Sequence, residues 1–242
     1  MDPQHTNAKH SYLRLGLIIL VVSTCLGMSI FQVYRASVKA ERYEQMVAAQ
    51  SAAPVSINAV IQQSSKDFAA LELRQAVLRG VWLSDKTIFL DNKIRKRWVG
   101  YHVLTPFQLE GTQSVILVNR GWVVAPRLRS ELPVVSSVSA NIELSGLLRR
   151  FEQRVFELKA EAPAGRVWQH VREEEYRSKS GLGSEVTLLP LILLQTSESN
   201  DGLAREWTTP EHPSMHHIGY AVMWLIFSIM AAAYGWMLWK RN

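Results

Sequence analysis

The sequence predicts a membrane protein of the α+β class. Two transmembrane helices flank one mainly antiparallel β domain, a small barrel or sandwich with short helices. Residues 15–34 and 218–239 carry no charged side chain, and about 20 such residues at 1.5 Å rise cross the roughly 30 Å hydrocarbon layer of a bilayer. Between them, residues 35–217 supply enough chain for one domain and contain short runs rich in β-branched and aromatic residues.

Charge and cysteine content exclude several classes of protein. The formal net charge is +6, from 27 Lys and Arg against 21 Asp and Glu. The basic residues lie at helix ends and in short mixed runs such as residues 93–97, without a nucleic-acid-binding motif. We therefore expect a solvated or lipid-facing basic surface and no nucleic-acid partner. The single cysteine, Cys25, lies in the first apolar segment, which excludes an intrachain disulfide and a thiol cluster for zinc or iron–sulfur ligation.

The flanks of the two apolar segments predict the topology. The first segment is longer than the hydrophobic part of a cleaved signal peptide, about 7–15 residues, so we expect a retained anchor. The N-terminal tail does not resemble the Arg- and Ser-rich amphipathic leader of a mitochondrial precursor, which favours a bacterial inner (plasma) membrane. Lys240 and Arg241 follow the second segment, and this basic flank predicts a cytoplasmic C-terminus. Two spans then place the tails, residues 1–14 and 240–242, in the cytoplasm and the domain in the periplasm.

Helical patterns precede the β domain. Residues 35–46 continue the charged helix pattern out of the membrane, so the first span is expected to project as one long helix. Residues 65–75 place Phe68, Leu71 and Leu73 at helical spacing, which predicts a short amphipathic helix.

Strand patterns follow. Residues 77–83 and 87–90 flank Ser84-Asp85-Lys86, a predicted hairpin turn. The remaining predicted elements are a strand pair at 100–105 and 115–118, a strand at 142–147, a short strand at 166–168, a helical turn at 173–178 and a strand at 187–196. Pro190 interrupts this last strand, which indicates an edge or bulge position.

The domain offers no recognisable catalytic set. The sequence has neither a G-x-S-x-G nor an H-E-x-x-H motif, so a tethered hydrolase is not expected and the protein is predicted not to be an enzyme. His102 follows Tyr101 in a predicted strand, and no neighbouring residue completes a catalytic set. A structural role for His102 is favoured.

Residues 118–123, VNRGWV, form the most unusual segment of the domain. Arg120 offers five donors in a rigid fork, and Trp122 a large apolar face with one donor. Gly121 permits a bulge or the close approach of another segment. We favour a strand end held by an arginine–carboxylate pair and packed under tryptophan; direct contact with a ligand is the alternative.

The start of the second span carries candidate ligands. Ser214 resembles a helix N-cap, with His216 and His217 in the first turn. The positive end of a helix disfavours a cationic imidazole, and the neutral form is the one that binds metals. His217, Tyr220 and Trp224 are spaced i, i+3 and i+7 on one face. An interfacial belt that only anchors the helix is the alternative, and side-chain chemistry alone favours the belt.

The outer end of the first span presents a matching face. Gln32, Arg35 and Lys39 have the same spacing and are expected at the same membrane surface as His217. Together the two faces would supply an imidazole, aromatic walls and cations, which suit a macrocycle with a metal centre and carboxylates, such as haem. In the alternative, Arg35 and Lys39 extend toward lipid headgroups.

Four segments lie in a recognisable order. They are Gly27 with Phe31, Gln32, Arg35 and Lys39; GYHVLTP at 100–106; VNRGWV at 118–123; and HIGYA at 217–221 with Trp224. In these segments, and over nearly its whole length, the chain resembles the surfeit locus protein one family of cytochrome c oxidase assembly factors. Phe31 departs from the family pattern, which usually has tryptophan there, so an aromatic wall remains while an indole donor is lost.

The resemblance implies a non-enzymatic factor that binds or presents haem a for insertion into the large subunit of the haem–copper cytochrome c oxidase. It also implies that His217 is the axial ligand of the haem iron, which reverses the preference for a belt. Gln32, Arg35, Tyr220 and Trp224 are the further expected cofactor-binding residues. The expected partners are the large oxidase subunit, haem a synthase and the lipid bilayer. A haem-free scaffold that stabilises the nascent subunit is the alternative.

Overall fold

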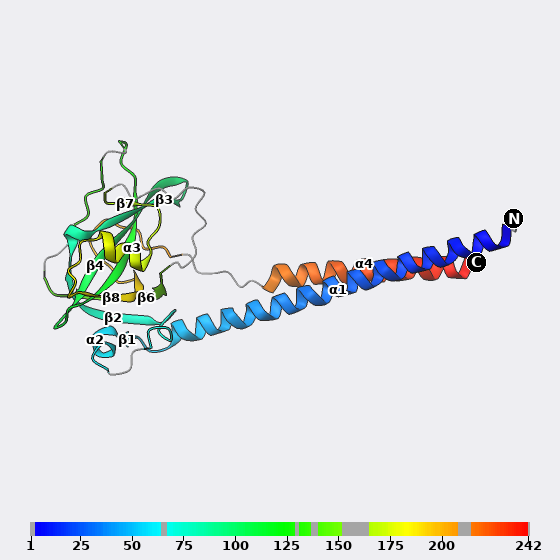
Figure 1. Ribbon diagram of the computed structural model, residues 1–242, viewed down its shortest axis with the longest axis horizontal. Helices are drawn as coiled ribbons and strands as arrows, with labels where there is room; N and C mark the ends of the chain where they lie inside the picture. The colour runs from blue at the N-terminus through cyan, green and yellow to red at the C-terminus, as the bar shows by residue number, and fades with distance from the viewer. Residues whose placement is uncertain are drawn as a thin grey trace. The chain divides into compact units, whose positions relative to one another are not determined.

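The computed structural model describes residues 3–63, 67–128, 131–136, 140–151, 165–207 and 214–241; within the two terminal helices it describes side chains from Tyr12 and from Met215 onward. The chain forms two compact units. One unit comprises residues 1–47 and 209–242, and the other comprises residues 48–208. Figure 1 shows the first as a pair of long helices and the second as a β-rich domain.

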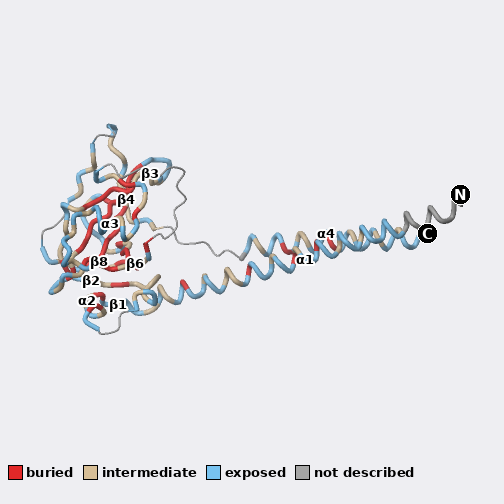
Figure 2. Tube along the Cα trace, in the orientation of Figure 1, coloured by how far each residue is buried: buried red, intermediate tan, exposed pale blue. Residues whose placement is uncertain are grey.

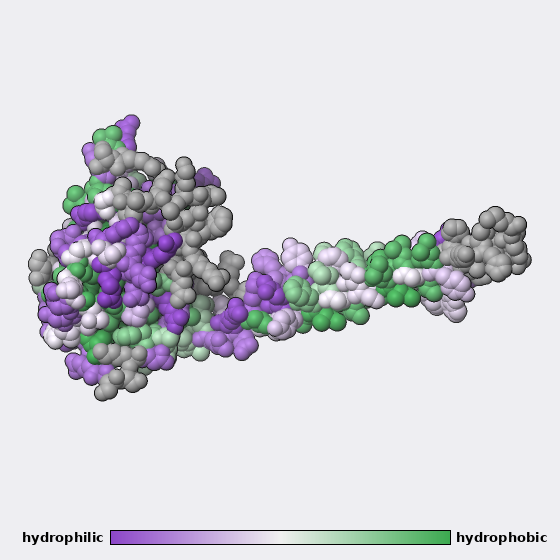
Figure 3. Space-filling view, in the orientation of Figure 1, coloured by the Kyte–Doolittle hydropathy of each residue, from purple (hydrophilic) through white to green (hydrophobic). Residues whose placement is uncertain are grey.

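Two helices form the first unit. Helix α1 (Pro3–Ser51) and helix α4 (Ser214–Arg241) contain segments long and apolar enough to cross a membrane. Helix α1 continues unbroken beyond residue 46, as predicted. Large apolar side chains such as Leu20 and Ile229 are about 60% exposed, and Figure 3 shows apolar residues gathered along the pair. Apolar helix surfaces of this kind suit a lipid environment, and they indicate a membrane protein with a central domain.

Five strands close into a barrel in the second unit. They are β2 (Gln75–Trp82), β4 (Trp98–Leu109), β5 (Ser114–Val124), β6 (Ile142–Arg150) and β8 (Thr187–Gln195). Their order is β2-β6-β8-β5-β4, and β4 pairs back onto β2. All of these pairs are antiparallel except β5–β8. The predicted β domain between two terminal apolar helices is therefore confirmed, and it is a barrel.

Short elements decorate the barrel. Strand β1 (Val55–Ser56) pairs with β2, while β3 (Ile88–Arg95) pairs with β4 and with β7 (Val167–Trp168). The short helices are α2 (Ile57–Val60), the 3-10 helix η1 (Ser84–Lys86) and α3 (Glu173–Lys179).

Two of the apolar clusters of the domain lie on opposite sides of the barrel strands. Leu191 and Leu193 of β8 belong to the cluster with Phe107 and Leu148, whereas Ile192 belongs to the cluster with Tyr176 and Trp168. Because side chains alternate along a strand, these two sets face opposite sides of the sheet. Figure 2 shows the buried residues concentrated on the barrel strands.

The predicted hairpin between β2 and β3 is wrong. Strand β2 pairs with residues 107–109 of β4, and β3 pairs with residues 98–104 of the same strand. The two strands therefore follow one another along one edge of β4. Helix η1 connects the two strands, and the residues on either side of it contact β4. Leu83 donates its N–H to the Pro106 carbonyl (2.9 Å), and the Thr87 hydroxyl lies 3.0 Å from that of Thr105. These contacts hold the connection against β4.

The helix predicted over residues 65–75 is also wrong, and the structure decides between the two alternatives for Pro190. In the described part of residues 65–75, the chain forms turns and no helix: the Asp67 carboxylate accepts the Ala69 and Ala70 N–H groups, and Leu73 has a φ of +67°. Local side-chain hydrogen bonds of this type compete with helix formation. Pro190 lies in β8 between β5 and β6, so it is not at an edge. The register shift opposite residues 115–117 confirms the bulge.

Candidate functional site

Helices α1 and α4 pack against each other through small and polar side chains. The Ser29 hydroxyl donates to the Ala221 carbonyl (2.9 Å), and the Ser228 hydroxyl donates to the Val22 carbonyl (3.2 Å). A Cβ added at Gly235 would lie 2.9 Å from Ile18 Cγ2. Small residues of this kind let membrane helices approach closely, and hydroxyl groups then bond to the partner backbone. Successive contacts move toward the N-terminus of α1 and toward the C-terminus of α4, so the two helices are antiparallel.

At one end of this interface, His217 meets Gln32. The His217 Nδ1 atom lies 2.8 Å from Gln32 Oε1. A carbonyl oxygen only accepts, so Nδ1 carries the proton and donates. In the neutral ring, the Nε2 atom then keeps its lone pair. A histidine whose second nitrogen is fixed by such a bond is oriented as metal-binding histidines are.

The other predicted site residues differ in how they relate to this pair. Lys39 and Arg35 lie close enough to His217 for their charges to act on it. Trp224 is half-buried and its ring meets that of Phe227 edge-on at 6.0 Å, whereas Tyr220 is 54% exposed. Gln32 and His217 are therefore in direct contact, while no hydrogen bond joins Arg35, Tyr220 or Trp224 to His217 within the described residues.

Two cations thus act on one oriented imidazole. Within the described residues, no group of three His, Cys, Asp or Glu side chains could hold a metal ion. A ligand that brings its own four nitrogen donors, such as a porphyrin, needs only an axial imidazole from the protein. The predicted Ser214 cap involves a side chain outside the described residues.

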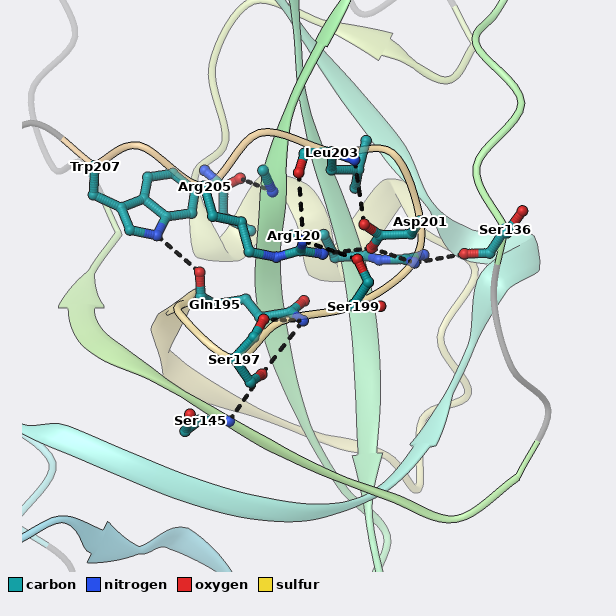
Figure 4. Close-up of polar contacts among 12 residues, drawn as sticks. Arg120, Ser136, Ser145, Gln195, Ser197, Ser199, Asp201, Leu203, Arg205 and Trp207 are labelled. Atoms are coloured by element: carbon teal, nitrogen blue, oxygen red, sulfur yellow. Dashed lines mark hydrogen bonds and ion pairs between the residues drawn. The ribbon is translucent and has the colours of Figure 1, made fainter.

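In the domain, Arg120 is the centre of a buried polar cluster (Figure 4). It lies on β5 and is 1% exposed. Its Nη2 atom donates to Asp201 Oδ2 (3.0 Å) and to the Ser136 carbonyl (2.6 Å). Its guanidinium carbon lies 4.6 Å from the centroid of the Trp82 ring. The expected arginine–carboxylate pair in residues 118–123 is confirmed.

Asp201 is shared between two arginines. Arg205 also bonds to Asp201 Oδ2, and the Leu203 N–H donates to Oδ1 (3.2 Å). Burial alone raises the pKa of Asp201, but the hydrogen bonds from Arg205 and Leu203 and the two positive charges outweigh it and lower the pKa. The carboxylate therefore stays ionised and holds the residue 197–207 loop on the barrel.

Gly121 and Trp122 attach the same loop. The Trp122 N–H donates to the Ala204 carbonyl (2.8 Å), and the Ala204 N–H donates back (2.9 Å). Gly121 has a φ of +139°, and a Cβ there would lie 2.7 Å from the Ala204 carbonyl oxygen, so only glycine fits. The Trp122 indole donates to the Lys93 carbonyl (2.7 Å) and carries Arg95 on its ring. The tryptophan over Arg120 is Trp82, which lies 38 residues earlier and gave no sequence signal.

His102 is half-buried beside Asn119 and Trp207. Its Nδ1 atom lies 3.3 Å from Asn119 Nδ2, and its ring meets Trp207 edge-on at 5.8 Å. Burial, with a smaller contribution from the positive charge of Lys93, lowers the pKa of His102 to about 4. The ring is therefore neutral at physiological pH.

Acidification is expected to destabilise the domain through His102. The pKa is near 6.5 in the unfolded chain and about 4 in the fold, so protons bind preferentially to the unfolded state as the pH falls from 6.5 to 4. We expect a loss of about 2 kcal/mol between pH 7 and pH 5 from this residue. Urea unfolding of the full chain in detergent should show a smaller loss in His102→Gln. An identical pH dependence in the variant would contradict this assignment.

Known proteins resemble the chain over most of its length. The SURF1 family model matches residues 19–229. A SURF1-like protein of Drosophila melanogaster is 29% identical over 153 residues, covering 57% of this chain and 50% of that protein. A SURF1-like protein of Monosiga brevicollis is 23% identical over 237 residues, covering 93% and 87%. Surfeit locus protein 1 of Xenopus tropicalis is 24% identical over 208 residues, covering 80% and 64%.

Proposed function

This chain belongs to the SURF1 family, whose members are known as cytochrome oxidase assembly factors, and we propose that it is one of them. We propose further that it acts without catalysing a reaction, by binding haem a and presenting it for insertion into the large subunit of the haem–copper oxidase. Haem a is then cargo, and the protein supplies an oriented ligand and a binding surface.

One observation carries the haem proposal: His217 donates from Nδ1 to Gln32 Oε1 at 2.8 Å. This bond leaves Nε2 as the ligand atom and holds the ring in one orientation. The charges of Arg35 and Lys39 act at the same place and would favour the carboxylates of a haem. Tyr220 and Trp224 would supply aromatic contact. The residues present thus fit the group.

The proposed membrane placement follows from the basic flank of α4. Lys240 and Arg241 lie in its last turn, and positive residues favour the cytoplasmic side. Both termini are then cytoplasmic, and the domain and His217 are on the periplasmic side of a bacterial inner membrane. Partners at that site would be the large oxidase subunit and haem a synthase.

Haem content tests the function. The full chain, expressed together with a haem a synthesis pathway and purified in detergent, should contain haem a in near-stoichiometric amount by pyridine haemochrome. The large oxidase subunit should co-isolate with it. Co-isolation of the subunit without any haem would overturn the haem proposal and favour the haem-free scaffold.

A further inference from the structure

A second candidate site lies wholly within the barrel domain and is independent of the haem proposal. A cavity of about 530 Å³ opens among residues of β3, β4, β5, β6 and β8, beside residues 169–171 and Trp207. Its volume is in the range of small-molecule sites, roughly 300–1,000 Å³. Ile192 and Leu194 line the cavity, whereas Leu191 and Leu193 between and beside them belong to the barrel interior. The cavity therefore lies on the outer face of the barrel.

Cations dominate the charge of this cavity. Lys93, Arg149 and Arg150 line it, and Glu72 is the one carboxylate among the described lining residues. Glu72 pairs with Arg150, with an Nε to Oε2 distance of 3.2 Å. Neither Lys93 nor Arg149 forms an ion pair within the described chain. Two positive charges are thus left uncompensated at one cavity, and this favours an anionic ligand.

His102 adds a neutral donor. Asn119 Oδ1 accepts the Gly121 N–H (3.3 Å), which turns Asn119 Nδ2 toward His102 Nδ1. Nδ1 must then accept, so the proton of the neutral ring is on Nε2. His102 therefore offers the cavity a hydrogen-bond donor, which an anion can accept. Asn119 is itself buried, so this arrangement is held rigidly.

Apart from Gln169 and His170, the rest of the lining is apolar. Leu104, Ile192 and Leu194 contribute aliphatic surface, and Trp207 contributes an indole ring. The Trp207 ring is fixed because its Nε1 donates to the Gln195 carbonyl at 2.8 Å. A ligand that fills the cavity must therefore have an apolar body as well as a negative charge.

We propose that this cavity binds a small organic anion with an apolar body, such as an aromatic carboxylate. The cations and the His102 donor receive the carboxylate, and the aliphatic and indole surfaces cover the body. Inorganic anions lack an apolar body, and cations with an apolar body are repelled by the positive charges of the cavity, so both should bind poorly.

Three probes that share one apolar body test the charge preference. They are 2-naphthoate, the neutral 2-naphthamide and the cationic 2-naphthylmethylammonium, measured by equilibrium dialysis against the full chain in dodecyl maltoside. We expect 2-naphthoate to bind at least about tenfold more tightly than either analogue. Equal binding of the three probes would overturn the proposal.

Variants locate the binding. Arg149→Gln should weaken 2-naphthoate binding about tenfold, whereas Arg97→Gln, an exposed cation in the β3–β4 turn, should not. Arg149→Glu should shift the preference toward the ammonium probe, a gain that misfolding cannot produce. If the Arg149 variants do not fold, Lys93→Gln takes their place. Unchanged binding in folded Arg149 or Lys93 variants would overturn the site. Haem content should stay constant in all variants, which separates this test from that of the proposed function.

Discussion

His217→Ala is expected to lower haem a occupancy of the purified full chain at least about tenfold. The variant removes the imidazole whose Nδ1 is bonded to Gln32 (2.8 Å) and whose Nε2 is left to bind iron. His217→Met keeps a different axial donor, so residual haem there should have a shifted absorption spectrum. Gln32→Leu removes only the orienting acceptor, and changes of this type cost about 10–100-fold in metal affinity. Absorption spectra and pyridine haemochromes of the three variants measure these effects.

The neighbouring histidine provides a matched control. His216 is the same residue type one position earlier on α4, and it is exposed. His216→Ala should therefore retain haem and an unchanged spectrum. Equal losses in the two alanine variants would show that the histidine pair acts only as a membrane-interface belt. No loss in either would remove His217 from the haem proposal.

The second large effect is expected at Asp201. Asp201→Asn removes the charge that Arg120 and Arg205 share, and the Arg120 and Arg205 side chains are only 2% and 12% exposed. Removing one member of a buried ion pair leaves uncompensated charge and costs about 3–5 kcal/mol. We expect the free energy of unfolding to fall by that amount, measured by urea unfolding of the full chain in detergent with tryptophan fluorescence.

An exposed ion pair of the same chemistry is the control. Arg79 Nε lies 2.7 Å from Glu143 Oε2 between β2 and β6, with side chains 67% and 53% exposed. Glu143→Gln should leave the free energy of unfolding nearly unchanged because water screens the pair. The pKa of Asp201 is lowered in the fold, so its contribution should be present above about pH 4 and be lost as the pH falls further. Equal costs for the two variants would contradict the anchoring role of Asp201.

Local sequence patterns predicted the elements well where neighbours along the chain decide the structure. The two apolar helices, the β4–β5 pair and the short elements β7 and α3 all formed. Hydrophobicity and β-propensity act over a few residues, so each of these could be recognised within its own segment. The β2–β3 hairpin failed because the choice of partner strand depends on β4, which lies outside that segment.

The candidate sites also differ in how far local sequence patterns could predict them. The i, i+3 and i+7 spacing placed His217 and Gln32 each on one face of its helix, and the structure brings the two side chains into contact across 185 residues of sequence. The axial-ligand role of His217 stays a prediction. The partners of Arg120 had no local signal, because Asp201 follows it by 81 residues and Trp82 lies on another strand.

The sequence by itself therefore determined the two apolar spans, the β-rich nature of the domain and the residue types available for chemistry, because these are properties of short segments. Only the tertiary structure decided that the strands close into a barrel, that Asp201 neutralises Arg120, and that side chains from five strands line one cavity. Those outcomes depend on which distant segments meet, and that is settled by packing and electrostatics over the whole domain.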